Sequence, residues 1–232
     1  MGKKNKAPVY MAISAMIAVY CIPVIYMLSL SFKRVGSAID GSIIPKDPTL
    51  QNYFNVFTSG IYTKYLANGL LVSLSSSLLA VIMGFFAAYA LSRFKFPCME
   101  GVFVGLIAIK AMPPVLMSIA FFQILVNIKL YNTLSALVIL NTIFNLPLAV
   151  WMLRNFIDAV PKELDESAYI DGCTQLRYLA SVMLPLSMTG IAAIFVQCFL
   201  LSWNEYMFAV TYITSGAKKT PTVAIFDFIG QW

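Results

Sequence analysis

The sequence predicts an all-α protein that crosses a membrane several times. Of its 232 residues, 60% are hydrophobic and only 11% are charged, and the mean hydropathy is +0.81. Charged residues make up about a quarter of a typical soluble domain, so this composition is typical of an integral membrane protein. Apolar runs of about 20 residues or more recur along the chain, and each is long enough to cross a bilayer as a helix. We expect five such helices in a single domain over residues 1–232.

The predicted helices differ in what interrupts them. The first run is too long for the apolar core of a signal peptide and no A-x-A cleavage site follows it, so we expect it to be retained. Pro23 should kink it, and the Pro113-Pro114 pair should bend the third helix. Polar, turn-rich sequence between the first two helices predicts an exposed loop, with a short surface helix at residues 50–57. The five helices are placed at residues 9–32, 66–91, 102–126, 134–153 and 186–213.

Several classes of chemistry are excluded by residue usage. The chain has no His, and its four Cys show no CxxC spacing, so neither a zinc site nor a disulfide framework is indicated. It also has no Gly-rich phosphate loop. The net charge of +6 is scattered between apolar runs, which argues against nucleic acid as a partner. We therefore expect no catalytic residue, metal or cofactor in this chain, and any ATP and Mg²⁺ that drive it would be bound by another subunit.

A polar stretch at residues 161–185, PKELDESAYIDGCTQLRYLASVMLP, stands out between two apolar runs. It holds Glu163, Asp165, Glu166 and Asp171, which are four of the ten carboxylates in the chain. Pro161 suits the first position of a helix, where no N–H is needed, and the acids would then lie near the positive end of the helix dipole. This segment is predicted to begin with a short helix.

The same stretch should contain a bend and a second helix. Gly172 can take the left-handed conformation that closes a helix, and Thr174 can cap the next one. In that second helix, apolar residues recur at i, i+3, i+4 and i+7 and predict one apolar stripe, formed by Leu176, Leu179, Ala180 and Met183. The result is a helix-bend-helix at the membrane surface.

The spacing of Glu166, Ala168, Gly172 and Leu184-Pro185 resembles the EAA loop of ABC importer permeases, with Ser167 and Val182 as small departures. In that family the loop is a coupling helix that docks into a cleft of a cytoplasmic ATPase. The resemblance implies acidic residues that meet basic residues of the ATPase, apolar residues that fill its groove, and a glycine that permits the bend. The coupling residues implied are Glu163, Leu164, Asp165, Glu166, Ala168, Tyr169, Asp171 and Gly172.

Two further motifs resemble the carbohydrate-uptake, maltose-type branch of these permeases: ALSRFKFP at residues 90–97 and Trp203-Asn204-Glu205. This resemblance implies a multi-pass subunit of the bacterial inner membrane that imports sugars. The implied partners are a second related permease, two ATPase subunits or domains and an extracytoplasmic sugar-binding protein. Permeases of this branch usually have six helices, whereas residues 215–232 read as an exposed tail. Either the chain is truncated or the protein works with five.

Four residues are candidates for the substrate path: Lys110, Asn141, Asn204 and Glu205. A charge inside a membrane helix marks a functional site by default, but the stem of Lys110 can also carry its ammonium toward the headgroups. Trp203 and Tyr206 equally fit an interfacial aromatic belt, and the serines of the second helix fit close packing or a polar passage. The basic residues divide almost evenly between the two sides, so orientation rests on the resemblance. The alternative function is a stand-alone secondary transporter or channel that uses Lys110 and Glu205.

Overall fold

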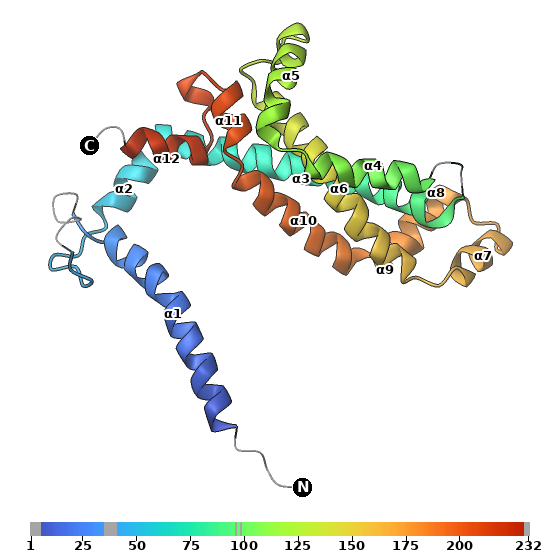
Figure 1. Cartoon of the computed structure of the whole chain (residues 1–232), viewed down its shortest axis with the longest axis horizontal. Coiled ribbons are helices and arrows are strands. Elements are labelled where there is room, and N and C mark those ends of the chain that lie inside the picture. The colour runs from blue at the N-terminus through green and yellow to red at the C-terminus, as the bar shows by residue number, and fades with distance from the viewer. Residues whose placement is uncertain (1–5, 35–40, 96, 98, 230–232) are drawn as a thin grey trace. The chain divides into compact units, whose positions relative to one another are not determined.

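A computed structural model describes residues 6–34, 41–95, 97 and 99–229, and every regular element in these residues is a helix (Figure 1). Residues 1–5, Phe96 in the ALSRFKFP motif and the last three residues of the tail lie outside the described residues. The structure forms two compact units, residues 1–63 and 64–232.

The first unit contains α1 (Ala7–Ser31), α2 (Gln51–Thr58) and the start of α3. The amide of Asn52 donates hydrogen bonds to the carbonyl oxygens of Ser31 and Lys33, at 2.9 and 2.7 Å, and thereby attaches α2 to the end of α1. Helix α1 includes Pro23 and is apolar around its whole circumference, as expected for a helix surrounded by lipid. The surface helix expected at residues 50–57 is confirmed as α2.

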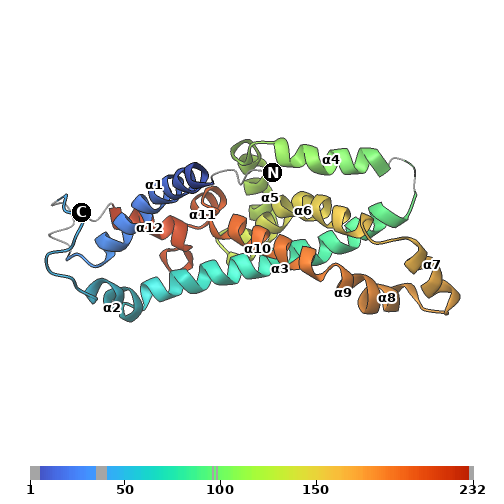
Figure 2. The ribbon, with the colours of Figure 1, turned by 90° about the horizontal axis from the view of Figure 1, so that it is seen from below.

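Three long helices form the body of the second unit: α3 (Ile61–Arg93), α6 (Leu134–Asp158) and α10 (Met188–Trp203), which run side by side (Figures 1 and 2). Glycines allow them to approach closely. A Cβ at Gly84 of α3 would lie 2.8 Å from the Cβ of Ala149, and one at Gly190 of α10 would lie 2.4 Å from the ring of Phe156. Helix α6 therefore packs against both of its neighbours at positions that accept no side chain.

Buried polar side chains connect the same three helices. The hydroxyl of Ser202 in α10 lies 2.9 Å from that of Ser76 in α3 and accepts a hydrogen bond from the amide of Asn145 in α6 at 2.8 Å. Ser73 and Ser77 donate to carbonyl oxygens of their own helix. All five side chains are buried. Ser76 thus joins α3 to α10, while Ser73 and Ser77 bond within α3, and this burial supports close packing over a polar passage.

Two apolar cores lie at different levels along α6. The first joins α3, α6, α10 and the end of the polar loop; it includes Phe85, Leu153, Tyr178, Met183 and Ile194. The second joins α3, α5, α6 and the C-terminal helices; it includes Val72, Leu125, Leu140, Phe144, Phe208 and Tyr212. Because α6 contributes to both cores, it connects the polar loop at one end of this unit to the C-terminal helices at the other.

The third predicted helix is divided in the structure. Helix α4 (Met99–Ala111) and helix α5 (Pro114–Asn127) meet at an angle of 100°. Pro113 lies in extended backbone at the break, and neither Pro113 nor Pro114 has an N–H to continue a helical ladder. The predicted bend is confirmed, but it separates two helices instead of curving one over residues 102–126.

The fifth predicted helix is also interrupted. Helix α10 ends at Trp203, and α11 (Met207–Tyr212) begins after a break of three residues, so no single helix covers residues 186–213. The segment before α10, Gln175–Leu186, meets it at 77°. If each bent pair counts as one span, the described residues hold five candidate membrane spans, the number expected from the sequence.

The C-terminal region is more ordered than the exposed tail expected over residues 215–232. It contains a short 3₁₀ turn (Gly216–Lys218) and helix α12 (Pro221–Ile229), in which Val223 and Ala224 are buried. The amide of Asn68 in α3 donates to the carbonyl oxygens of Ala217 in this turn, at 3.1 Å, and of Lys219 directly after it, at 3.0 Å. The expectation of an exposed tail was wrong at these positions, because Val223 of α12 belongs to the second core, although Ile225 and Phe226 are exposed.

Candidate functional site

The polar loop forms a helix at one end of the second unit (Figure 1). Helix α7 (Glu163–Ile170) is followed by α8 (Gln175–Tyr178), a π-helical turn (Leu179–Met183) and α9 (Leu184–Leu186). The predicted start at Pro161 was two residues early, since Lys162 is the N-cap. Glu163, Asp165 and Glu166 occupy the first turn of α7, where negative charge is stabilised by the helix dipole.

Helix α7 ends in a Schellman motif around Gly172. The N–H of Gly172 donates to the carbonyl of Tyr169 at 3.0 Å, and the N–H of Cys173 donates to the carbonyl of Ala168 at 2.9 Å. Gly172 has φ +73°, so the predicted left-handed conformation is confirmed. The capping prediction for Thr174 was wrong: it occupies the N-cap position of α8, but its side chain makes no capping bond.

The two sides of α7 differ in what they present. Asp165 is buried and Ala168 packs against the first core, so this side faces the protein. The rest of the helix surface exposes apolar residues: Leu164 is 41% exposed and Ile170 86%, and Tyr169, one turn after Asp165, is 51% exposed. Glu163, Glu166 and Asp171 are exposed with them. This apolar and acidic face suits a partner with an apolar groove and basic residues. Sequence reasoning missed Ile170, although it directly follows Tyr169.

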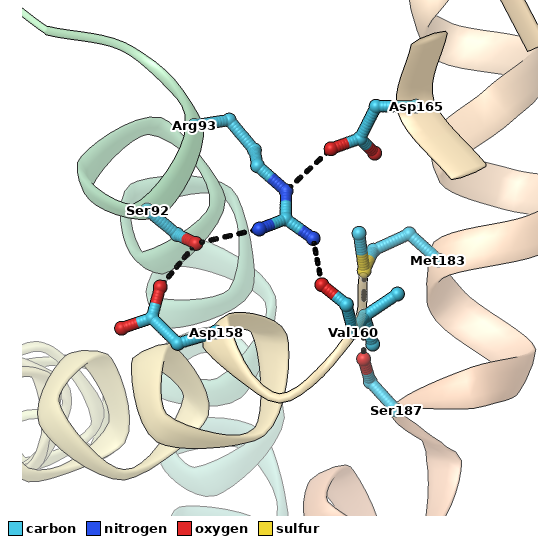
Figure 3. Close-up of polar contacts among 7 residues, drawn as sticks. All are labelled: Ser92, Arg93, Asp158, Val160, Asp165, Met183 and Ser187. Carbon is cyan, nitrogen blue, oxygen red and sulfur yellow. Dashed lines mark hydrogen bonds and ion pairs between the residues drawn. The ribbon is translucent and has the colours of Figure 1, made fainter. Parts of the chain in front are cut away.

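Asp165 was expected to meet basic residues of a partner, whereas the structure pairs it with Arg93 at the end of α3 (Figure 3). The Arg93 Nε lies 2.6 Å from Asp165 Oδ2, and the two side chains are only 6% and 11% exposed. The same guanidinium donates to the carbonyl oxygen of Val160 at 2.7 Å and to the hydroxyl of Ser92 at 3.4 Å. Ser92 in turn donates to Asp158 at the end of α6.

The apolar stripe predicted for the second helix is only partly present. Leu179 and Met183 are buried in the first core, while Leu176 and Ala180 are exposed. Tyr178, which the stripe did not include, is almost completely buried. The π-helical turn over Leu179–Met183 widens the helix and shifts the residues that follow onto another face. A periodicity of 3.6 therefore did not hold through this segment.

Among the described residues, the four substrate-path candidates form no hydrogen bond or ion pair with one another. Each forms its hydrogen bonds with a different part of the backbone. The Lys110 ammonium, in the last turn of α4, donates to the carbonyl oxygen of Phe144 at 3.2 Å. Asn141 is buried and Asn204 is exposed, and the amide of each donates to the carbonyl four residues earlier in its own helix. The carboxylate of Glu205 accepts hydrogen bonds from the N–H groups of Phe208 and Ala209, at 2.6 and 3.1 Å.

These contacts define different surroundings for the two charged candidates. Glu205 satisfies the first turn of α11, in the manner of a capping residue. Lys110 borders a cavity of about 330 Å³ lined otherwise by Ile107, Pro147, Leu148 and Trp151. Lys110 therefore borders an open apolar space while its ammonium is held by the Phe144 carbonyl.

Residues 47–231 match the family described as "Binding-protein-dependent transport system inner membrane component". The chain belongs to this family. It is 32% identical over 220 residues to the inner membrane ABC transporter permease protein YcjP of Escherichia coli K12, which covers 93% of this chain and 79% of that protein. It is 30% identical over 210 residues to the trehalose transport system permease protein SugB of Mycobacterium tuberculosis, which covers 90% of this chain and 77% of that protein.

A solved structure has the same fold. A bacterial ABC transporter involved in the import of the acidic polysaccharide alginate includes a chain that superposes with a TM-score of 0.79 at 19% identity, over 100% of this chain and 87% of that one. The family assignment makes this protein a multi-pass ABC permease of the inner membrane, and the EAA loop and coupling helix are features of that family. It favours the permease over the stand-alone secondary transporter or channel.

Proposed function

We propose that this chain is the transmembrane permease subunit of a bacterial ABC importer for sugars or oligosaccharides. It forms half of a translocation path with a second related permease, and an extracytoplasmic binding protein delivers the solute. The names of its relatives support this proposal: besides the trehalose permease, a melibiose/raffinose/stachyose import permease of Bacillus subtilis is 30% identical over 211 residues, 90% of this chain and 76% of that protein.

The observation that carries the proposal is the exposed face of α7. Leu164, Tyr169 and Ile170 leave apolar surface in contact with water at the end of the unit, beside the carboxylates of Glu163 and Glu166. Burying that surface in a groove is favourable by about 25 cal/mol per Å², and basic residues around the groove would fix its register through the two carboxylates. A cytoplasmic ATPase subunit with such a groove is the partner we assign to this face.

The mechanism is mechanical coupling. Two ATPase subunits bind ATP and Mg²⁺ and close on each other, and the groove moves α7. Ala168 and the buried Tyr178 and Met183 pass this displacement to the first core, which contains parts of α3, α6 and α10. Because these helices pack without gaps at Gly84 and Gly190, they move as a body and open the path outward.

Within the proposed path, Lys110 and Asn204 are the candidates with exposed side chains, while Asn141 and Glu205 act by holding their helices in shape. Lys110 is tested by comparing Lys110→Met, which keeps the apolar stem, with Lys110→Ala. A role in the path predicts that both variants lose uptake at normal protein level. Normal uptake in Lys110→Met would assign the residue to the packing of α4 against α6.

The coupling role is tested by co-purification from detergent-solubilised membranes that contain the chain, its partner permease and the ATPase. We expect the wild-type chain to retain the ATPase and Glu166→Arg to release it, with loss of trehalose or melibiose uptake in reconstituted vesicles. Glu100→Arg is the matched control, because Glu100 is an exposed glutamate on α4 outside the loop. Equal retention of the ATPase by both variants would refute the assignment of α7 as the docking helix.

A further inference from the structure

We propose that Arg93 is a positioning residue for coupling: it fixes α7 to the end of α3, so that a displacement of α7 is transmitted to a membrane-spanning helix. This inference rests on the proposed function and adds a residue that the EAA loop does not contain. This role of Arg93 is inferred from the structure. In the sequence Arg93 lies about seventy positions before Asp165, and no spacing rule connects the two.

The guanidinium of Arg93 holds the start of α7 at two points. Its Nε lies 2.6 Å from the Asp165 carboxylate in the first turn, and one terminal nitrogen donates to the Val160 carbonyl, in the link before the helix, at 2.7 Å (Figure 3). A planar guanidinium can make both contacts at once only in one orientation, because its donors form a rigid fork. The pair of contacts therefore fixes direction as well as distance.

The link between α6 and α7 is held from the other side too. Ser92, the neighbour of Arg93, donates to Asp158 in the last turn of α6, and Arg154 lies 3.5 Å from the same carboxylate. Residues 159–162 thus lie between two polar contacts to the end of α3: the Ser92–Asp158 hydrogen bond before them and the Arg93–Asp165 ion pair after them. A shift of α7 relative to α3 must break a buried charge pair or move α3 with it.

Close packing does not set the spacing of α7 and α3 here. A cavity of about 200 Å³ lies between them, lined by Tyr89, Arg93 and Phe94 from the end of α3 and by Lys162, Asp165, Glu166 and Tyr169 from the start and body of α7. The ion pair spans this region where apolar contacts are incomplete. Tyr178 of the first core lies near the Asp165 carboxylate, but its buried hydroxyl makes no hydrogen bond among the described residues.

The orientation of the acids on α7 separates their roles. Glu163 and Glu166 are exposed, whereas Asp165 is turned inward and buried. A buried ion pair contributes little net stability compared with well-packed apolar residues of similar volume, although removing one partner alone is strongly destabilising. Fixing the geometry of a moving helix is a function that apolar replacements would not reproduce.

The test uses the complete importer in reconstituted vesicles and compares single and double variants. Arg93→Met and Asp165→Leu each leave one buried charge without its partner, and we expect lower amounts of folded protein. The double variant Arg93→Met with Asp165→Leu removes both charges and should recover thermal stability and retain the ATPase. Its solute uptake per ATP hydrolysed should nevertheless fall at least fivefold. Glu100→Leu removes an exposed charge on α4 outside these attachments, so it is the control and should change this ratio less than twofold.

A second measurement reports position directly. Spin labels at Ser167→Cys on α7 and Met83→Cys on α3, in a background free of native cysteines, should give a narrow distance distribution in the wild type and a broader one in the double variant. Wild-type uptake per ATP together with an unchanged distribution in the double variant would overturn this inference alone. A wild-type chain that retains no ATPase would overturn the proposed function, and the coupling role of Arg93 with it.

Discussion

Gly172 offers a perturbation whose cost can be worked from the backbone alone. Its φ is +73°, and no atom lies within 4 Å of the position that a Cβ would take. A side chain there meets no steric obstacle, so the whole penalty is conformational. An L-residue in this region loses about 1–2 kcal/mol, a β-branched residue loses more, and Asn loses less because it visits the left-handed region more readily.

This penalty is large relative to the turn that it strains. About 1.4 kcal/mol is a tenfold change in an equilibrium constant, so Gly172→Ala should lower the ratio of closed to open Schellman turn about tenfold. Opening the turn unwinds the end of α7 and displaces Tyr169 and Ile170 from the docking face. Uptake per ATP should therefore fall in the order Gly172→Asn, Gly172→Ala, Gly172→Val, with Val most affected.

The assay is solute uptake and ATP hydrolysis measured in the same reconstituted vesicles. Gly216→Ala is the matched control, since that glycine also has no atom within 4 Å of its Cβ position and no positive φ. The reasoning fails if Gly172→Val couples hydrolysis to uptake as well as the wild type does, or if the three variants show no order.

Three further predictions concern the helices behind the loop. Gly84→Ala should lower the free energy of unfolding by about 1–3 kcal/mol, because its Cβ would lie 2.8 Å from that of Ala149. Gly105→Ala is the control, because a Cβ there meets no neighbour, and thermal unfolding in detergent should show a lower melting temperature for Gly84→Ala alone. Ser202→Ala should cost about 1 kcal/mol through its lost bonds to Ser76 and Asn145, and equal melting temperatures for variant and wild type would contradict this. Glu205→Ala should destabilise by about 0.5–2 kcal/mol through the lost cap, with partial recovery in Glu205→Gln; uptake lost at unchanged stability would instead place Glu205 in the substrate path.

The fold class and several local features were predictable from composition and from the chemistry of single residues. Apolar runs of membrane length predicted an all-α membrane protein, and the Pro113-Pro114 pair marked the position of the bend between α4 and α5. Gly172 was predicted to be left-handed because only a glycine takes that conformation at little cost, and the structure confirms it. In each case the determining interactions lie within a few residues.

Features set by distant residues were not predictable from pattern alone. The partner of Asp165 is Arg93, on another helix, and no spacing rule connects them. The π-helical turn after Tyr178 disrupted a stripe that assumed 3.6 residues per turn. The break after Trp203 follows from capping by Glu205 and from a hydrogen bond of Thr222 to the Glu205 carbonyl at 2.8 Å, which depends on how α12 folds back.

The central claim is that the exposed face of α7 docks on a separate ATPase subunit. A photo-crosslinking amino acid at Ile170 should capture that subunit when the importer is irradiated in membranes, since this side chain is 86% exposed. The same probe at Ile119, which is also exposed, should not capture it, because Ile119 belongs to α5, a helix that lies well away from α7 (Figure 1). Capture of the ATPase from residue 119, or its absence from residue 170, would contradict the account.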